Sequence, residues 1–304
     1  MSLSFHVFDP RDRNLAPASG AVESYPGGDV AVRHLQPAPG GTVPVAWNAG
    51  GTLDYAALAQ WVAFHTHDQP AYGPRSCEPI LVMPYLPSAR GDRDRTRDAQ
   101  AAARLTAATG ARHVIAADPH SDAWADAAAD WGLTVHAVTA AELIGGSTRL
   151  ATDCEWEWDA VIAPDAGAVT RAGAVAHTLG VPLLTAGKVR DQATGQLSGF
   201  TAPEGIGDGR FLVVDDICDG GGTFAGLAQA IATVAPSAEL HLWVTHGLFT
   251  GRWRENLLPN FASITSADTT PAPSFSPHPY GIRSVRLLPH VLVALANLTI
   301  TVAA

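Results

Sequence analysis

Apolar runs of strand length alternate with segments of helical periodicity along most of the chain. In the first such segment, Leu58, Trp61 and Val62 recur at the three- and four-residue spacing that places side chains on one face of a helix. Strands that alternate with helices are typical of parallel sheets flanked by helices. We predict strands at 78–86, 113–120 (strand and turn), 133–138, 159–165, 181–184, 211–216 and 239–247, and helices at 54–66, 97–110, 121–132, 168–179, 224–234 and 285–300.

The alternation is interrupted at residues 145–159, "GGSTRLATDCEWEWD". The length of 304 residues also suits two domains at the usual size of about 150 residues each. We therefore predict two α/β domains of similar build, an N-terminal domain at 1–147 and a C-terminal domain at 148–290. The remaining residues, 291–304, are predicted to form a helix that packs back on the N-terminal domain.

Charge and cysteine content narrow the class of protein. Lysine and arginine total 19 against 29 acidic residues, a formal net charge of −10, which disfavours binding to nucleic acid or to an anionic membrane surface. The 3 cysteines cannot all pair and match no zinc-site spacing, and no apolar run is long enough to span a membrane. We expect a cytoplasmic protein that needs a local cluster of basic groups, or a metal ion, to hold an anionic ligand.

The segment "FLVVDDICDGGGT", residues 211–223, carries the most specific motif. Ligands of parallel sheets collect at the carboxyl ends of the strands, and here an apolar strand leads into Asp215 and Asp216 and then into Gly220, Gly221 and Gly222 before a helix begins. Glycine amides and a helix N-terminus form a cradle for an anion, whereas carboxylates accept hydrogen bonds from sugar hydroxyls or bind Mg²⁺. The segment therefore indicates a phosphorylated sugar; the alternative is a solvated glycine-rich turn with an aspartate cap.

The segment resembles the ribose-phosphate signature of phosphoribosyltransferases and of the ribose-phosphate diphosphokinase (phosphoribosyl pyrophosphate, PRPP, synthetase) family. Further segments resemble motifs of the diphosphokinases in the order of that family, and a plain phosphoribosyltransferase lacks the first of them, the ATP-type segment. They are "MPYLPSARGDRDR" (83–95), "DPHS" (118–121), "PDAGAVTRA" (164–172), "GKVRDQATG" (187–195), "VTHGLFTG" (244–251) and "DTTP" (268–271). The resemblance implies two similar phosphoribosyltransferase-like domains, each a mainly parallel sheet flanked by helices.

The resemblance also implies a reaction and a site. The β,γ-diphosphoryl group of ATP would move to the C1 hydroxyl of ribose 5-phosphate, with Mg²⁺, in an enzyme that assembles into dimers or hexamers. Implied catalytic residues are Lys188, Arg190 and His120; implied ATP-binding residues are Tyr25, Asp29, Arg90 and Asp92. Implied magnesium ligands are His120 and Asp165, and implied ribose-phosphate residues are Asp215, Asp216, Asp219, Gly220, Gly221, Gly222 and Thr223.

Several of these residues have simpler interpretations. His120 could be a structural histidine, and Asp165 could be the N-cap of the helix at 168–179. Lys188 and Arg190 could belong to an ordinary basic loop, and Tyr25 could be a surface aromatic residue. The adenine-contacting turn that includes Tyr25 and Asp29 comes from a neighbouring subunit in the family.

The chain departs from the family pattern at three positions. Gly220 replaces a hydroxyl residue of the phosphate loop, Gly91 replaces a glutamine after Arg90, and Ala168 replaces a glycine. A loop widened at Gly220 could admit ADP-ribose in place of ribose 5-phosphate. A catalytically silent regulatory homologue and a PRPP-consuming phosphoribosyltransferase are further alternatives; the retained basic and acidic residues disfavour the first, and the ATP-type segment around Arg90 disfavours the second.

Overall fold

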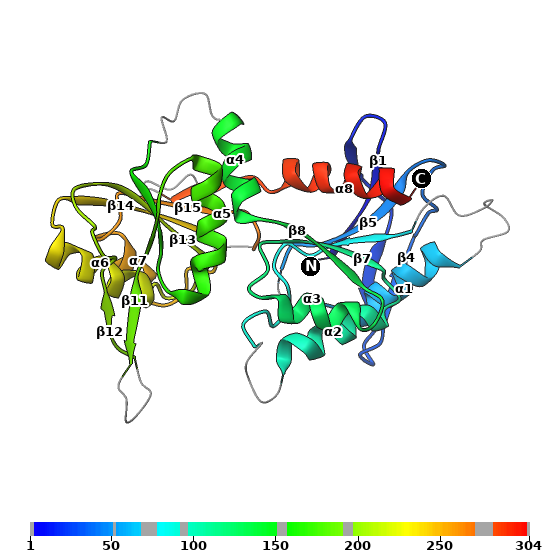
Figure 1. The fold of residues 1–304 in the computed structure, drawn as a ribbon. Helices are drawn as coiled ribbons and strands as arrows, with labels where there is room; N and C mark the ends of the chain where they lie inside the picture. The colour runs from blue at the N-terminus through cyan, green and yellow to red at the C-terminus, as the bar shows by residue number, and fades with distance from the viewer. Residues whose placement is uncertain are drawn as a thin grey trace. The chain divides into compact units, whose positions relative to one another are not determined.

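The computed structural model describes residues 3–50, 53–67, 78–91, 97–150, 157–190, 197–270 and 282–302. They form two compact units, each with its own six-stranded sheet (Figure 1). The first unit contains residues 3–138 and the C-terminal helix α8 (Leu288–Val302), and the second begins at residue 139. The division lies just before α4 (Ala140–Leu150), and the boundary predicted at residue 147 falls within that helix.

The first sheet combines an antiparallel edge with a parallel half. Its order is β2 (Asn14–Pro17), β1 (Leu3–Asp9), β5 (Val43–Asn48), β6 (Ile80–Val82), β7 (His113–Ala117) and β8 (Thr134–Val138), parallel from β5 onward. The helices α1 (Tyr55–Thr66), α2 (Asp98–Ala108) and α3 (Asp122–Ala129) lie against one face, and α8 lies against the other (Figure 1). The buried side chains of Leu58, Trp61 and Trp124 pack in the core between the sheet and these three helices.

A two-stranded hairpin extends the first unit. It consists of β3 (Ala21–Ser24) and β4 (Val30–Arg33); Val22 and Val32 pack against the core, and Gln60 of α1 forms hydrogen bonds to β4. The Gln60 amide donates to the carbonyl of Val30 at 2.8 Å and accepts from the amide of Val32 at 3.0 Å. Gln60 thereby satisfies backbone groups at the open edge of β4, as a neighbouring strand would.

The second sheet is parallel throughout. Its order is β10 (Leu183–Thr185), β9 (Ala160–Ala163), β13 (Gly209–Cys218), β14 (Ala238–Gly247), β15 (Ser263–Ala267) and β16 (Ile282–Val285). Its helices are α4, α5 (Val169–Leu179), α6 (Gly222–Val234) and the short α7 (Trp253–Leu257), and a 3-10 turn, η1 (Ala166–Ala168), precedes α5. Most residues of β13 and β14 are buried because neighbours and helices cover both strands, which explains their continuous apolar runs.

Several element boundaries differ from those predicted. The strand predicted at 78–86 is only three residues long, since Pro84 has no amide hydrogen to continue the ladder. The strand predicted at 211–216 runs two residues further, to Cys218. The polar sequence of β15, "SITSA", gave no strand signal, although this segment is buried in the sheet.

The residues on either side of 191–196 form a hairpin of β11 (Gly187–Arg190) and β12 (Leu197–Thr201). Phe200 of β12 lies against Gly226 of α6, where a Cβ atom would come within 2.1 Å of the phenyl ring. The hairpin therefore packs on the helix that follows the glycine-rich loop.

Among the helices that the structure describes, none is long and apolar enough to cross a membrane.

Gly226 should be required for this packing. In Gly226→Ala the added methyl group would displace the Phe200 ring, so we expect faster hydrogen exchange at residues 199–201 and a free energy of unfolding lower by about 1–3 kcal/mol, the usual effect of overpacking. Gly222→Ala in the same helix is the matched control, because a Cβ there would meet nothing within 4 Å. Equal exchange rates in the two variants would contradict the expectation.

Candidate functional site

The carboxyl ends of three neighbouring strands meet at one edge of the second sheet. Val213 of β13 lies opposite Ile162 of β9, and Cys218 lies opposite Gly247 of β14. Because these strands are parallel, the segments that follow them lie at the same edge. The predicted motifs "PDAG" and "DGGGT" follow β9 and β13, whereas "THG", predicted to follow a strand, forms the last three residues of β14; the fourth motif, "DPH", lies at the corresponding edge of the first sheet.

Two adjacent carboxylates approach this edge from within β13. Asp215 and Asp216 have side chains that are 18% and 5% exposed, and the amide of Asp216 donates to Oδ1 of Asp215 at 2.9 Å. Arg171, in the first turn of α5, contacts both carboxylates: its Nη1 is 3.8 Å from Asp215 Oδ1 and its Nη2 is 3.8 Å from Asp216 Oδ2. One guanidinium thus faces two carboxyl groups.

The electrostatics of the pair follow from its burial. Burial raises the pKa of Asp215, the charge of Asp216 raises it further, and the guanidinium of Arg171 opposes both effects. No role was assigned to Arg171 from the sequence, although it lies in the "PDAGAVTRA" segment; only the packing of α5 on β13 directs it to the acids.

The glycine-rich loop turns its carbonyl groups toward residues 248–256. Three consecutive carbonyl oxygens accept hydrogen bonds from that segment. The bonds run from Leu248 N to Cys218 O (2.8 Å), from Thr250 N to Asp219 O (3.2 Å) and from Asn256 Nδ2 to Gly220 O (2.6 Å). Since the carbonyl and amide of a trans peptide point in opposite directions, the amides of residues 219–221 point away from the 248–256 segment.

The three glycines of the loop have different local surroundings. Gly221 has a φ of 76°, in the left-handed region that favours glycine, and a Cβ there would lie 2.9 Å from Leu257. At Gly220 a Cβ would come no closer than 3.9 Å to the carbonyl oxygen of Thr250, and at Gly222 it would meet nothing within 4 Å. Gly221 is therefore required by the backbone, whereas Gly220 and Gly222 leave open space beside the loop.

Helix α6 begins at Gly222, and no side chain caps its N-terminus in the described structure. The first amides of a helix lack intrahelical partners, and the helix dipole favours an anion at this position. Thr223, half-buried in the first turn, adds a hydroxyl group. Thr250 also donates a short side-chain hydrogen bond to Asp219, which ties this acid to the neighbouring loop.

Asp165 follows β9 and forms a close ion pair with Lys188 of β11. Its other oxygen accepts from the amide of Gly167 at 2.8 Å, so Asp165 also caps η1. Burial raises the pKa of Asp165, but the bond and charge of Lys188, together with the amides of Gly167 and Ala168, outweigh this effect and lower the pKa overall. The carboxylate is thus held ionised while about a quarter of its side chain remains exposed.

Lys188 is the only lysine in the sequence, where every other basic side chain apart from histidine is arginine. An ammonium group is a compact point charge that can move between partners, unlike the planar guanidinium. The next predicted basic residue, Arg190, ends β11, where its backbone pairs with Leu197; its side chain lies outside the described residues.

In the first unit, Asp118 and His120 follow β7. Asp118 is buried with a φ of 35°, uncommon for a residue other than glycine, and its amide donates to Val138 O at 2.8 Å. His120 is half-buried at the same end of the strand. The sheet therefore positions both residues at its carboxyl edge.

The ATP-type segment is described in part. Arg90 is exposed, whereas Gly91 is buried, and a Cβ at Gly91 would lie 2.7 Å from Cβ of Asp98 at the start of α2. A glutamine at this position would require α2 to shift, which gives the departure from the family pattern a steric reason. Asp92 lies outside the described residues.

Tyr25 and Asp29 form the turn between β3 and β4. The amide of Tyr25 donates to the carbonyl of Asp29 at 2.8 Å, and Arg33 donates to the Tyr25 hydroxyl at 2.5 Å. With 43% of its surface exposed, the ring of Tyr25 is accessible for stacking.

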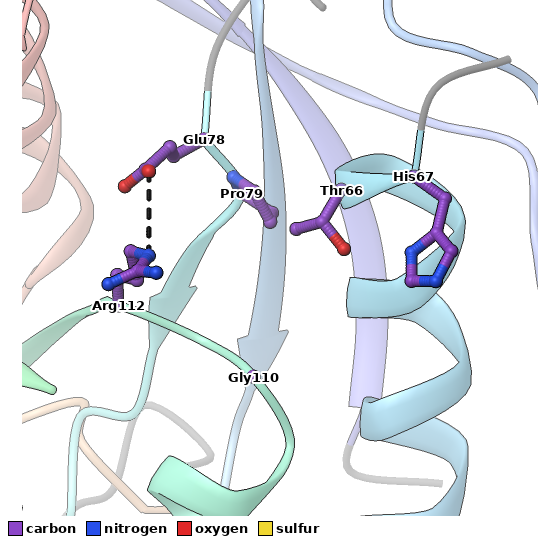
Figure 2. Close-up of a pocket in the computed structure, with 6 residues that line it drawn as sticks. All are labelled: Thr66, His67, Glu78, Pro79, Gly110 and Arg112. Atoms are coloured by element: carbon purple, nitrogen blue, oxygen red, sulfur yellow. Dashed lines mark ion pairs between the residues drawn. The ribbon is translucent and has the colours of Figure 1, made fainter. Parts of the chain in front are cut away.

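A hollow of about 260 Å³ lies at the opposite end of the first sheet from Arg90 and His120. Figure 2 shows Glu78 and Arg112 facing each other on one side, 3.6 Å apart, and Thr66 and His67 at the end of α1 on the other. Glu78 and Arg112 precede β6 and β7, so the hollow is at the amino ends of these strands. It contains no residue predicted for the site.

Within the described parts of the chain, no group of three or more histidine, cysteine, aspartate or glutamate side chains lies close enough to hold a metal ion. The two predicted magnesium ligands belong to different units, His120 to the first and Asp165 to the second. Taken alone, the ionised and partly exposed carboxylate of Asp165 suits Mg²⁺, which prefers oxygen ligands; the imidazole of His120 is the less usual donor.

Comparison with known proteins identifies the family that the chain resembles. Residues 140–256 match the phosphoribosyl transferase domain. The ribose-phosphate pyrophosphokinase of Granulibacter bethesdensis is 33% identical over 181 residues, which cover 56% of this chain and 54% of the relative. That of Caldanaerobacter subterraneus is 30% identical over 208 residues, 63% of this chain and 60% of the relative. In these alignments the chain spans between half and two thirds of the length of the curated relatives.

The crystal structure of phosphoribosylpyrophosphate synthetase from Mycobacterium smegmatis superposes with a TM-score of 0.69 at 20% identity, covering 96% of this chain and 92% of that one. The predicted fold class is confirmed: two phosphoribosyltransferase-like domains, each with a sheet rich in parallel strands and flanked by helices. The predicted resemblance to the ribose-phosphate diphosphokinase family is confirmed as well.

The lowered pKa of Asp165 can be tested through the single lysine. Reductive methylation with ¹³C-formaldehyde would label Lys188 and the terminal amine, and the Lys188 methyl signals should shift as Asp165 becomes protonated. We expect a midpoint below the ordinary aspartate value of 3.8. The Asp165→Asn variant, which cannot titrate, serves as the control, and a midpoint at or above 3.8 would contradict the expectation.

The same pair should contribute to stability in a defined pH range. A lowered folded-state pKa stabilises the fold above the unfolded-state value and loses that contribution as pH falls through the lowered value. Lys188→Gln should therefore reduce the free energy of unfolding at pH 7 by about 1 kcal/mol. The difference in the free energy of unfolding between this variant and the wild type, measured by urea denaturation, should become smaller in acid. A difference that does not depend on pH would contradict a contribution from the ion pair.

Proposed function

We propose that the protein transfers the β,γ-diphosphoryl group of ATP to the C1 hydroxyl of a 5-phosphorylated ribose, by default ribose 5-phosphate, giving PRPP and AMP. The observation that carries the proposal is the pair Asp215 and Asp216 beside a glycine loop that opens helix α6, at the carboxyl edge of a parallel sheet. The relatives named as ribose-phosphate pyrophosphokinases support the same reaction.

The second unit would bind the acceptor sugar. Asp215 and Asp216 would form hydrogen bonds with the ribose hydroxyls, and Arg171 would hold the two acids in place. The amides of the loop and of the first turn of α6, with the Thr223 hydroxyl, would hold the 5-phosphate. Asp219, held by Thr250, would complete the wall of the cradle.

The nucleotide would be bound through the residues implied by the family. Arg90 and Asp92 would contact the ATP phosphates and ribose, while Tyr25 and Asp29, on an exposed turn, would contact the adenine from a neighbouring subunit. Assembly into dimers or hexamers stays a prediction, as does a cytoplasmic location.

The transfer itself exchanges one P–O bond for another. The C1 oxygen forms a bond to the β-phosphorus of ATP, and the hydroxyl proton is released. The bond between the β-phosphorus and the oxygen that bridges the α- and β-phosphates breaks, and AMP leaves with this bridging oxygen. Such reactions depend on positioning and on charge neutralisation. Lys188 and Arg190, on the β11–β12 hairpin, would supply positive charge, with Lys188 exchanging its contact with Asp165 for the phosphoryl oxygens.

Magnesium is the expected cofactor. Asp165, and His120 from the first unit, would hold the ion, which when bound would neutralise charge on the ATP phosphates. Asp165 is suited to this role because its carboxylate is ionised and accessible.

ADP-ribose is the second candidate acceptor and would yield an ADP-ribose 1-pyrophosphate. The open space at Gly220 and Gly222 favours it, because no atom fills the position where a side chain at either residue would stand. A phosphate that carries a further substituent could use this space.

The first experiment is an assay for AMP release from ATP and Mg²⁺, with ribose 5-phosphate and ADP-ribose in parallel and the products identified by mass. Turnover with ribose 5-phosphate would confirm the proposal. Turnover with ADP-ribose alone would identify the second acceptor, and no turnover with either would favour a silent regulatory homologue.

The acid pair should control affinity for the sugar. The double variant Asp215→Asn/Asp216→Asn, which replaces both charged acceptors, should bind ribose 5-phosphate at least about tenfold more weakly by calorimetry, while its affinity for ATP is retained. Asp208→Asn, an exposed aspartate before the same strand, provides the control and should bind as the wild type does. Unchanged sugar affinity in the double variant would refute the role of the pair.

A further inference from the structure

We infer that Asn256 is a positioning residue for the phosphate-binding loop, which it keeps in the conformation that accepts an anion by locking one peptide unit between two glycines. This inference rests on the proposed function. Asn256 lies in α7, a short helix that follows the next strand of the sheet, and no ligand-binding segment identified from the sequence includes it.

The peptide unit in question joins Gly220 to Gly221. Its carbonyl oxygen accepts from Asn256 Nδ2 at 2.6 Å, the shortest of the bonds from residues 248–256 to the loop carbonyls. The other bonds from this segment come from the backbone amides of residues 248, 249 and 250, which any sequence would supply. The bond to the Gly220 carbonyl therefore depends on the side chain at position 256.

This peptide unit needs a lock because glycine flanks it on both sides. A peptide flip requires large changes in ψ of the residue before it and in φ of the residue after it, and glycine allows both at little cost. Elsewhere in the loop, Asp219 has a Cβ that restricts its backbone and a side chain held by Thr250. The Gly220–Gly221 unit is thus the point at which the loop can most easily change conformation.

A flip at this point would change the shape of the loop. The carbonyl is held toward α7, and the amide of the same unit, that of Gly221, lies toward the buried thiol of Cys218. A flipped unit would exchange these two partners and displace the neighbouring amides that would hold a phosphate. The loop would keep its sequence and lose affinity for an anion.

The surroundings of Asn256 allow it to act as a fixed anchor. The backbone amide of Asn256 donates to the carbonyl of Arg252 at 3.1 Å. The adjacent Leu257 is fully buried and lies where a Cβ of Gly221 would stand. Because α7 is fixed to the core by this leucine, the amide of Asn256 holds a defined position.

The test compares Asn256→Ala with the double variant Asn256→Ala/Gly220→Ala. Removing the lock should weaken binding of the sugar phosphate about tenfold, the order expected for one lost hydrogen bond, and leave ATP affinity unchanged. Alanine at 220 fits the observed backbone, since Gly220 is outside the left-handed region and a Cβ there meets only Thr250 O at 3.9 Å. It should restore most of the lost affinity by restricting the flip.

Asn260→Ala is the matched control, because it removes a side-chain hydrogen bond from the same segment without touching the loop. Binding would be measured calorimetrically with ribose 5-phosphate and, in parallel, ADP-ribose, and the thermal unfolding of each variant would be recorded without ligand. A positioning role predicts weak binding in Asn256→Ala, recovery in the double variant and near-normal binding in Asn260→Ala.

The outcomes separate this inference from the proposed function. If the wild type binds neither sugar phosphate, the proposed function fails and the inference fails with it. If the wild type binds one of them and Asn256→Ala binds it equally well, the function stands and the lock is refuted. Weak binding that alanine at 220 does not restore, or equal weakening in Asn260→Ala, would show that α7 acts only as a structural support and would also overturn the inference.

Discussion

The parallel pairing of β13 with β9 and β14 is the constraint on which the second unit depends. Because these strands are covered on both faces, their polar groups gather toward the carboxyl ends of the strands, and parallel pairing brings those ends to one edge. The acids of β13, Asp165 after β9 and the segment after β14 therefore become neighbours although they are far apart in the sequence. The same pairing brings residues 248–256 against the glycine loop, so the sheet also supplies the partners of the loop carbonyls.

Burial of several carboxyl groups at this edge of the sheet is electrostatically unfavourable, and two cations, Arg171 and Lys188, reduce the cost. Asp215 and Asp216 are adjacent and largely buried, and Arg171 faces both of them from α5. Asp165 is held by Lys188, a lysine in a chain whose other strongly basic residues are arginines. Arginine can bridge two fixed carboxylates, whereas an ammonium group can leave one partner for another. Arg171 is thus suited to bridge two fixed acids, and Lys188 is suited to a change of partner.

For two of the departures from the family pattern, the neighbouring structure either explains the substitution or shows what the substitution changes. Gly91 has no room for a side chain because Asp98 approaches it, so the start of α2 and the glycine belong together. Gly220 has room for a side chain, and its absence leaves a flexible peptide unit held by Asn256. In each case a neighbouring element, α2 or α7, determines whether the substitution alters the site.

The sequence alone determined the fold class, the strands with strong apolar runs and the positions of the motifs, because local periodicity and glycine chemistry are written in consecutive residues. It did not reveal β15, whose serines and threonines are buried by their neighbours, or the extension of β13 beyond its acids. It also assigned no role to Arg171 or Asn256. Their partners lie tens of residues away, and only the packing of α5 and α7 against the sheet brings a guanidinium to two acids and an amide to one carbonyl. Contacts of this kind depend on tertiary distance, which no pattern of neighbouring residues encodes.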